Sequence, residues 1–118
     1  MIKTILILGG STVKYDDFGN CYTKSSFNYY LTGLKSFCEE LIWVVPENHL
    51  NEITTKVDHD KIRILSYKIS FYSIIKNLFK LIKILIEKRP FSCIMFPSPY
   101  IFFYAYFIKF LSYKFITY

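Results

Sequence analysis

Short apolar runs alternate with longer, partly polar stretches along the whole chain. The runs consist mainly of large apolar residues, and the first four are followed directly by Gly, Pro or Ser. Continuous apolar runs of this length are typical of strands that helices cover on both faces of a sheet. We therefore predict five strands, at residues 5–8, 41–45, 62–65, 93–96 and 114–118.

A helical repeat is clearest between residues 71 and 88. Lys76, Lys80, Lys83 and Glu87 recur at intervals of four, three and four, so they form one narrow stripe on a helix whose other positions are mostly apolar. A broad apolar surface of this kind suits a helix that covers a parallel sheet.

Two further helices are predicted from apolar spacing and capping residues. Ser25 or Ser26 can cap the first helix, whose apolar side includes Phe37 and Cys38. The other helix follows a Pro-Ser-Pro turn and is strongly aromatic. The stretches between elements are rich in turn-forming residues. The predicted helices are thus residues 25–38, 71–88 and about 100–111, and the predicted loops are residues 11–24 and 47–61, the second with at most one helical turn.

The order of these elements predicts an α/β domain. Strands that alternate with helices form parallel sheets with right-handed crossovers. We expect about five strands with helices on both faces, in the order 3-2-1-4-5, which is a Rossmann-like arrangement. In that order, the loops after the first and fourth strands open onto the same crevice. Gly9, Gly10 and Ser11 would then lie opposite Ser98 and Tyr100.

Composition indicates one folded domain. The chain has 118 residues, of which 53% are hydrophobic and 20% aromatic, far more than a disordered protein carries. Its three cysteines are widely spaced and odd in number, so neither a disulfide scaffold nor a zinc site is expected. His49 and His59 have no metal-ligand spacing around them, and no metal is predicted.

Charge and hydropathy suggest where the protein acts. The net charge is +6, from 15 basic and 9 acidic residues, but only two of the basic residues are arginines and no nucleic-acid-binding module is evident. We therefore expect no nucleic acid as a partner. The first apolar run is too short for a signal peptide, and the uncharged stretch at residues 93–108 is too short for a membrane span. A cytoplasmic location is expected.

The sequence Gly9-Gly10-Ser11 is the first candidate for ligand binding, because glycine lets a ligand approach the backbone. A dinucleotide fingerprint would need a third glycine and a helix that starts at once. Here a loop intervenes, and Glu47 lies 38 positions after Gly9, rather than about 20 positions as in the fingerprint. No cofactor is predicted.

A longer segment resembles a known enzyme family. It comprises the loop Lys14-Tyr15-Asp16-Asp17-Phe18-Gly19-Asn20-Cys21-Tyr22, then Ser25-Ser26-Phe27 at the start of a helix, then Phe37-Cys38-Glu39-Glu40-Leu41-Ile42-Trp43-Val44-Val45-Pro46. These segments resemble the amino-terminal half of bacterial GT-B glycosyltransferases. The resemblance is to the retaining, family 4-like group that includes capsule and lipopolysaccharide enzymes.

The resemblance implies an acceptor-binding domain. In GT-B enzymes the amino-terminal half receives the saccharide or lipid-linked acceptor, and the carboxyl-terminal half holds the nucleotide-sugar. Carried over to this chain, the acceptor side of the cleft comprises Gly9, Gly10, Ser11, Tyr15, Asp16, Asp17, Gly19, Asn20, Tyr22, Ser98 and Tyr100. The carboxylates and the amide would bind sugar hydroxyls, and a tyrosine would stack on a pyranose face. A simpler alternative is that Asp17, Gly19 and Asn20 only shape turns.

Lys76, Lys80 and Lys83 suggest a second kind of contact. Lysines beside a broad apolar face, with an aromatic helix nearby, are typical of a protein that lies on an anionic bilayer. The simpler interpretation is that both helices only cover the sheet and expose just the lysine stripe. We expect an anionic membrane surface as a partner, at the inner face of the plasma membrane. A non-catalytic membrane-surface module or scaffold is the alternative to an enzyme.

We expect the chain to be part of a larger enzyme. Residues 115–118 resemble a strand that is interrupted at its carboxyl end, and the paired glutamates that hold the donor in the family belong to a second domain. Sugar transfer in cell-surface polysaccharide synthesis would then need a carboxyl-terminal domain or a partner chain. Eleven aromatic residues between Phe96 and Tyr118 predict that the isolated chain is poorly soluble.

Overall fold

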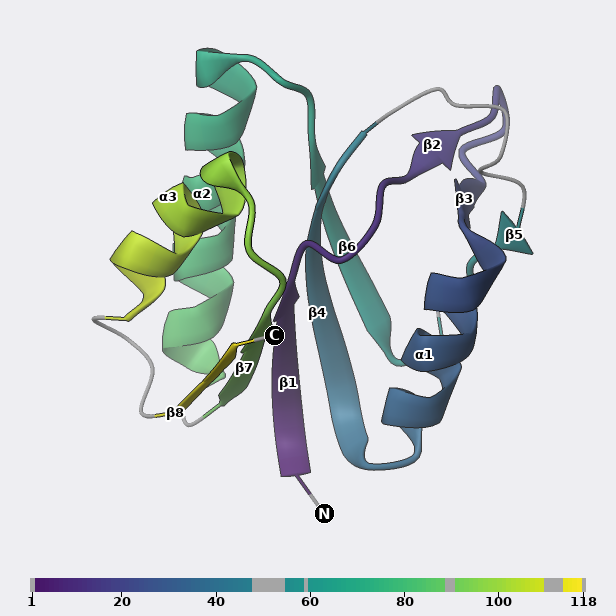
Figure 1. The fold of residues 1–118 in the computed structure, drawn as a ribbon, viewed down its shortest axis with the longest axis horizontal. Helices are drawn as coiled ribbons and strands as arrows, with labels where there is room; N and C mark the ends of the chain where they lie inside the picture. Colours follow the sequence, from purple (N-terminus) through teal and green to yellow (C-terminus); the bar gives the residue numbers. More distant parts are fainter. Residues whose placement is uncertain (1, 48–54, 59, 89–90, 110–113, 118) are drawn as a thin grey trace.

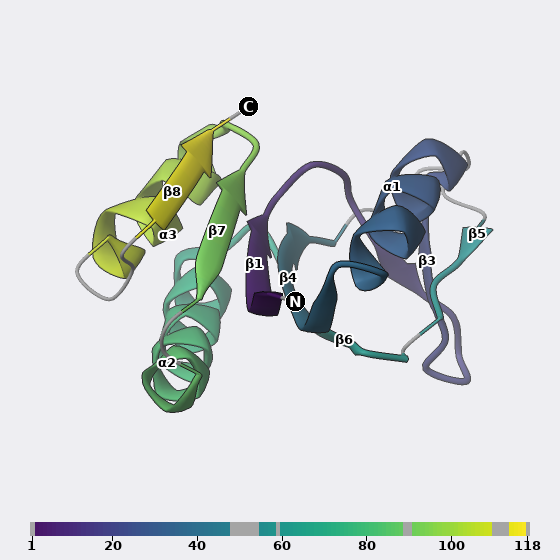
Figure 2. The ribbon, with the colours of Figure 1, turned by 90° about the horizontal axis from the view of Figure 1, so that it is seen from below.

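The chain folds around a twisted parallel sheet. The computed structural model describes residues 2–47, 55–58, 60–88, 91–109 and 114–117. Helix α1 covers one face of the sheet, and helices α2 and α3 cover the other (Figures 1 and 2). The strands are β1 (Ile2–Leu8), β2 (Lys14–Tyr15), β3 (Cys21–Thr23), β4 (Cys38–Pro46), β5 (Thr55–Lys56), β6 (Ile62–Tyr67), β7 (Ser92–Met95) and β8 (Lys114–Thr117), and the helices are α1 (Ser25–Lys35), α2 (Phe71–Glu87) and α3 (Pro99–Ile108).

The central sheet has the predicted topology. Its body is the parallel order β6-β4-β1-β7, and the short β8 pairs in parallel with β7 at the edge. The predicted first and fourth strands, β1 and β7, are therefore neighbours. The α/β class and the broadly Rossmann-like parallel sheet are confirmed. Pairing extends beyond the apolar runs, with Ile2 opposite Cys38 and Pro46 opposite Tyr67.

Two hydrophobic cores, one on each face, explain the apolar strands. Successive side chains of a strand point to opposite faces, so Leu6 and Leu8 of β1 pack against α2 and α3, while Ile5 and Ile7 pack toward α1. Trp43 of β4, the single tryptophan, is fully buried in the core on the α1 side. This two-sided burial is the reason why the strands show no polar alternation.

The prediction of a long loop at residues 11–24 is wrong. Strands β2 and β3 form an antiparallel hairpin there, and β3 also pairs with β5, with Tyr22 opposite Lys56. Strands this short leave no periodic signal in the sequence. The predicted loop at residues 47–61 likewise contains β5, while residues 48–54 and 59, which include both histidines, lie outside the described residues.

The boundaries of the first helix also differ from prediction. Helix α1 ends before Phe37 and Cys38: Cys38 begins β4, and Phe37 is 64% exposed. Neither Ser25 nor Ser26 caps the helix, because the cap position is Lys24 and no side chain bonds there. Ser25 and Ser26 lie one and two positions too late to cap the free amides of the first turn.

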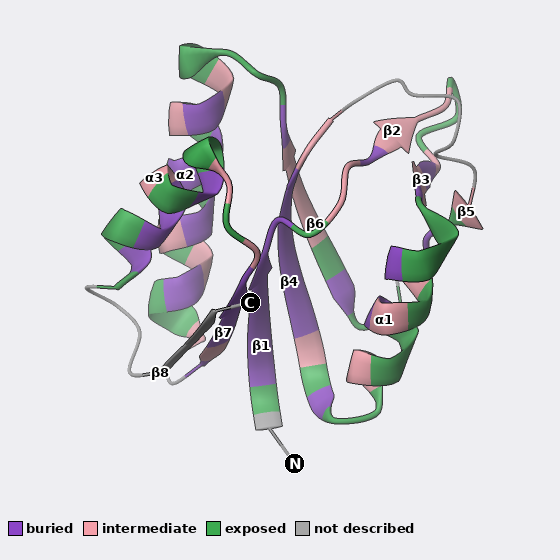
Figure 3. Ribbon diagram, viewed as in Figure 1, coloured by how far each residue is buried: buried purple, intermediate pink, exposed green. Residues whose placement is uncertain are grey.

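Helices α2 and α3 expose more apolar surface than the simpler interpretation predicted. The expectation that only the lysine stripe would face water is wrong, as the green segments of Figure 3 show. The exposed apolar residues of α2 are Phe71, Tyr72, Phe79 and Ile86, with exposed fractions of 56 to 80%. Helix α3 is shorter than predicted, because it ends at Ile108, and residues 110–113 lie outside the described residues.

The chain leaves β1 through two glycines. Gly9 and Gly10 have φ angles of 80° and 94°, a region that favours glycine. Trp43 Nε1 donates a hydrogen bond of 2.9 Å to the carbonyl oxygen of Gly9, and the rings of Trp43 and Phe27 stack with centroids 5.1 Å apart. A Cβ on Gly10 would lie 2.6 Å from Cζ of Phe27 and 3.0 Å from Cδ2 of Phe96. A larger residue therefore does not fit at Gly10.

We expect Gly10→Ala to destabilise the fold by about 2–4 kcal/mol, because the methyl group adds backbone strain to overpacking against Phe27. Gly33→Ala is the matched control: Gly33 lies within α1, and an added Cβ would meet nothing within 4 Å. Alanine there should stabilise the protein by about 0.5–1 kcal/mol. Urea unfolding followed by Trp43 fluorescence measures both changes. Equal effects of the two substitutions would contradict the packing argument.

Candidate functional site

The candidate acceptor residues lie along the carboxyl edge of the sheet and form two groups. The hairpin group stands beside α1, and the second group lies where α3 begins, on the opposite side of β1 (Figures 1 and 2). Gly9 and Gly10 lie between them. The hairpin group contains Ser11, Tyr15, Asp16, Asp17, Gly19, Asn20 and Tyr22, and the second group contains Ser98 and Tyr100.

Asp16 organises the turn of the hairpin. Its Oδ1 accepts hydrogen bonds from the backbone amides of Phe18 at 2.9 Å and Asn20 at 2.8 Å. Its Oδ2 accepts bonds of 3.0 Å from Asn20 Nδ2 and from the Tyr22 hydroxyl. The Asn20 side chain contributes most to holding the pKa of Asp16 below its ordinary value of 3.8. Asp16, Asn20 and Tyr22 thus bind one another and fix the shape of the turn.

The tip of the hairpin projects into solvent. Gly19 has a φ angle of 83°, and its amide donates to the carbonyl oxygen of Asp16 at 3.1 Å, so it shapes the turn as the simpler alternative expects. Asp17 is exposed, and the neighbouring Phe18 is 90% exposed. The hydrogen bonds of Asp16 therefore fix a turn that exposes the ring of Phe18 and the carboxylate of Asp17.

Tyr15 joins the hairpin to the central sheet. Its hydroxyl lies 3.0 Å from Oγ of Ser66 in β6. Burial raises the pKa of this hydroxyl, and the nearby negative charge of Glu47 acts in the same direction. Glu47 directly follows β4, and its backbone forms an isolated parallel β-bridge with that of Val13. Two hydroxyls therefore meet near the carboxyl edge, and the charge of Glu47 acts on one of them. Sequence reasoning missed Ser66 and considered Glu47 only for a dinucleotide site, although both lie at the ends of predicted strands.

Hydroxyl groups of the loop after β1 extend this polar region. Oγ of Ser11 and Oγ1 of Thr23 are 3.0 Å apart, and the Thr23 hydroxyl donates to the carbonyl oxygen of Thr12 at 2.8 Å. The hydroxyl oxygen of Thr12 is buried and has no hydrogen-bond partner within the described part of the chain. A buried hydroxyl in this state costs about 1–3 kcal/mol, so Thr12 is a further candidate to bind a polar ligand.

Protein side chains fill the space directly above the two glycines. Phe27 and Phe96 pack over Gly10, and Ile101 packs over Gly9, where an added Cβ would lie 3.0 Å from Cγ1 of Ile101. The loops after β1 and β7 do approach each other, as the strand order requires. Their contact runs through Phe96 and Ile101, and both glycines serve this close packing.

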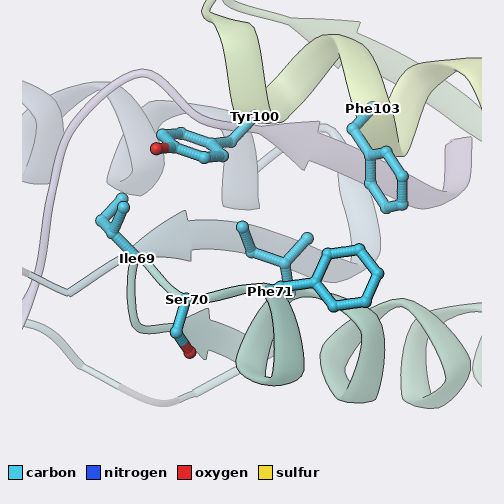
Figure 4. A pocket seen from close by; sticks show the side chains of 6 residues that line it. Ile69, Ser70, Phe71, Tyr100 and Phe103 are labelled. Carbon is cyan, nitrogen blue, oxygen red and sulfur yellow. The ribbon is translucent and has the colours of Figure 1, made fainter.

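Tyr100 lines a separate apolar groove, and Ser98 caps the helix that carries Tyr100. Oγ of Ser98 accepts a hydrogen bond of 3.4 Å from the Ile101 amide, so Ser98 caps α3. Tyr100 contacts the ring of the buried Tyr67, with centroids 6.5 Å apart. The groove has a volume of about 410 Å³ and is lined by Ile69, Ser70, Phe71, Ile74, Tyr100 and Phe103 (Figure 4).

Cysteine and metal chemistry find little support in the described residues. Cys21, Cys38 and Cys93 are buried and unpaired. Burial raises the pKa of Cys21 to about 11 and that of Cys93 to about 12, so their thiolates are scarce at neutral pH. Within the ranges that the structure describes, no three His, Cys, Asp or Glu side chains gather as a metal site would require. The hydroxyls, carboxylates and aromatic rings of the candidate site are groups that can bind a polar ligand.

Comparisons with known proteins return no match. No protein-family model, no curated protein and no solved structure matches the chain. The glycosyltransferase resemblance therefore rests on the segments at residues 14–22, 25–27 and 37–46. No helix among the described residues has the length and apolarity that a membrane crossing requires.

The Asp16 bonds predict how the hairpin depends on pH. Because the pKa of Asp16 is lower in the folded chain than in the unfolded chain, its stabilising effect is complete above about pH 4 and is lost as the pH falls through the folded pKa. The amide shift of Asn20, followed by NMR from neutral to acidic pH, should titrate with a midpoint below 3.8. Asp16→Asn should abolish this titration, and Asp17→Asn should leave it unchanged. A midpoint at or above 3.8 would count against the described bonds.

Proposed function

We propose that this chain is the amino-terminal, acceptor-binding domain of a GT-B glycosyltransferase. The enzyme would transfer a sugar from a nucleotide-sugar to a saccharide or lipid-linked acceptor in cell-surface polysaccharide synthesis. The sequence resemblance suggests the family, and the parallel order β6-β4-β1-β7 is compatible with it. In sheets of this type, ligands bind beyond the carboxyl ends of the strands, where the winding direction reverses.

The observation that carries this proposal is the polar region between the hairpin and β6. The Tyr15 hydroxyl lies 3.0 Å from Oγ of Ser66 near the end of β6, and Glu47, which directly follows β4, is near enough for its charge to help raise the pKa of Tyr15. A few convergent polar groups on a rigid scaffold are what fixes the orientation of a ligand in a binding site. Hydroxyls and carboxylates are suitable partners for sugar hydroxyls, because each can accept a hydrogen bond and the former can also donate one.

Asp16 contributes by positioning and not by direct contact in this proposal. Its carboxylate oxygens already accept four hydrogen bonds within the hairpin, two on each oxygen. It therefore holds the turn so that Asp17 and Phe18 meet the acceptor. Phe18 could stack on a pyranose face, a role that the sequence had suggested for Tyr15 or Tyr22. Both tyrosines instead direct their hydroxyls to other side chains.

Transfer itself needs both substrates in one preorganised pocket. In GT-B enzymes the nucleotide-sugar binds to the carboxyl-terminal domain, so the contribution of residues 1–118 is to bind and orient the acceptor. The chain should then bind saccharides on its own and show no turnover without the donor half.

Saccharide binding tests the proposal. Methyl pyranosides of glucose, galactose and N-acetylglucosamine are titrated into the chain. Saturation-transfer NMR detects contact between sugar and protein. Trp43 emission reports changes in the loop after β1, because Trp43 is hydrogen-bonded to Gly9 at the start of that loop. We expect millimolar binding of at least one sugar. Glu47→Gln and Tyr15→Phe should each weaken it about tenfold, as the loss of one good hydrogen bond predicts.

The controls separate this site from the rest of the surface. Glu87→Gln removes an exposed carboxylate from α2 and should leave saccharide affinity unchanged. A nucleotide-sugar should not bind to the chain. Tight binding of UDP-glucose would contradict the assignment to the acceptor half, and failure of every sugar to bind would favour the alternative of a non-catalytic module.

A further inference from the structure

The outward surface of α2 alternates apolar and basic side chains. Tyr72, Lys76, Phe79, Lys83 and Ile86 follow one another at intervals of four and three residues, which places them on a single line along the helix. All five are exposed, with exposed fractions of 76% for Tyr72, 69% for Phe79 and 56% for Ile86. This line points away from the core, which α2 meets through its other side.

Helix α3 presents a second apolar surface beside the first. Its ten residues include no charged side chain, so it is apolar on all sides. Phe102 and Tyr106 are 55% and 57% exposed, and Phe107 is 37% exposed. Lys109 follows the helix, and its Nζ lies 5.0 Å from the centre of the Tyr106 ring. Lysine and aromatic side chains are thus neighbours here as they are on α2.

Buried hydrogen bonds join the two helices into one surface. The Tyr104 hydroxyl of α3 donates to the carbonyl oxygen of Ile74 in α2 at 2.9 Å. Asn77 Nδ2 donates to the same hydroxyl at 3.4 Å and to the carbonyl oxygen of Leu65 in β6 at 3.3 Å. These bonds lie in the core and fix both helices on the sheet. Their outward sides therefore form a single fixed face, which we name the α2–α3 face (Figure 3).

The charge of the α2–α3 face is strongly one-sided. It carries Lys76, Lys80, Lys83 and Lys109, against Glu87 as the acidic residue of the two helices. Lys76, Lys80 and Lys83 form no ion pair within the described residues. Lys88, the next lysine along the chain, by contrast forms an ion pair of 2.9 Å with Glu40 of β4.

We propose that the α2–α3 face binds the surface of an anionic lipid bilayer. Aromatic rings suit the boundary between headgroups and acyl chains, and lysines reach past them to lipid phosphates while their stems stay in apolar surroundings. Each lysine near such a surface contributes about 1 kcal/mol, which corresponds to about fivefold in affinity. This inference does not depend on the glycosyltransferase proposal, because the face lies on the other side of the sheet from the hairpin.

Vesicle flotation tests the inference with the whole chain. Vesicles of phosphatidylglycerol mixed with phosphatidylcholine should carry the protein upward in a density gradient, whereas aggregated protein sinks. Vesicles of phosphatidylcholine alone should bind it far more weakly. Salt at about 1 M, where the Debye length is about 3 Å, should release most of the bound protein.

Matched triple variants show which lysines act. Replacing Lys76, Lys80 and Lys83 by Gln should lower affinity for the anionic vesicles about 100-fold, as three contributions of fivefold predict. Replacing Lys3, Lys24 and Lys56 by Gln changes the net charge equally, on exposed positions outside the α2–α3 face, and should have a small effect. An equal loss of vesicle affinity in both triple variants would show that only the net charge of the protein matters. That result would overturn the proposed face.

An introduced tryptophan reports on contact directly. In Phe79→Trp, emission should shift to the blue with anionic vesicles, while the fully buried Trp43 on the opposite face gives a constant background. No shift would contradict the proposal. A concentration-dependent dimer in sedimentation velocity, together with no vesicle binding, would assign the α2–α3 face to a second copy of the chain. The same variants are also titrated with saccharide. Unchanged saccharide affinity would show that the two proposals are independent of each other.

Discussion

The close packing where the chain leaves β1 is the constraint on which the rest of the structure depends. Gly9 and Gly10 turn with positive φ angles, Gly9 against Ile101 and Gly10 directly under the rings of Phe27 and Phe96. The hydrogen bond from Trp43 fixes the same turn from β4. Because helix, hairpin and sheet all meet here, the turn decides where the loop after β1 goes. It directs that loop toward α1, and so it places the hairpin on one side of the sheet and leaves the other side to α2 and α3.

The core architecture was predictable because burial on both faces leaves a strong signal. The stretch of β1 from Ile5 to Leu8 is buried and apolar at every position, and its spacing from the next strand implies the crossover helix. The hairpin was not predictable in this way. It is held by side-chain bonds to Asp16 and by pairing of β3 with the distant β5, and neither kind of interaction has a period along the sequence.

The candidate site shows the same division between pattern and contact. A sequence cannot distinguish an aspartate that meets a ligand from one that holds a turn, and Asp16 does the second within the described structure. Position along the fold is the better guide. Glu47 and Ser66 lie at the carboxyl ends of adjacent parallel strands, so the topology alone would have brought them together. Their side chains had no motif to reveal them.

The two proposed surfaces lie on opposite sides of the sheet, and the apolar groove adjoins one of them. The apolar groove lined by Ile69, Phe71 and Tyr100 lies at the carboxyl edge, where α2 and α3 begin, and so adjoins the α2–α3 face (Figure 4). If that face rests on a bilayer, the carboxyl edge stands beside the lipid and not above it. Tyr67 touches Tyr100 on the groove side, and the neighbouring Ser66 bonds to Tyr15 on the hairpin side. An acceptor with a lipid tail could then place its sugar in the polar region while its tail stays in the membrane. A soluble saccharide would not need this membrane contact.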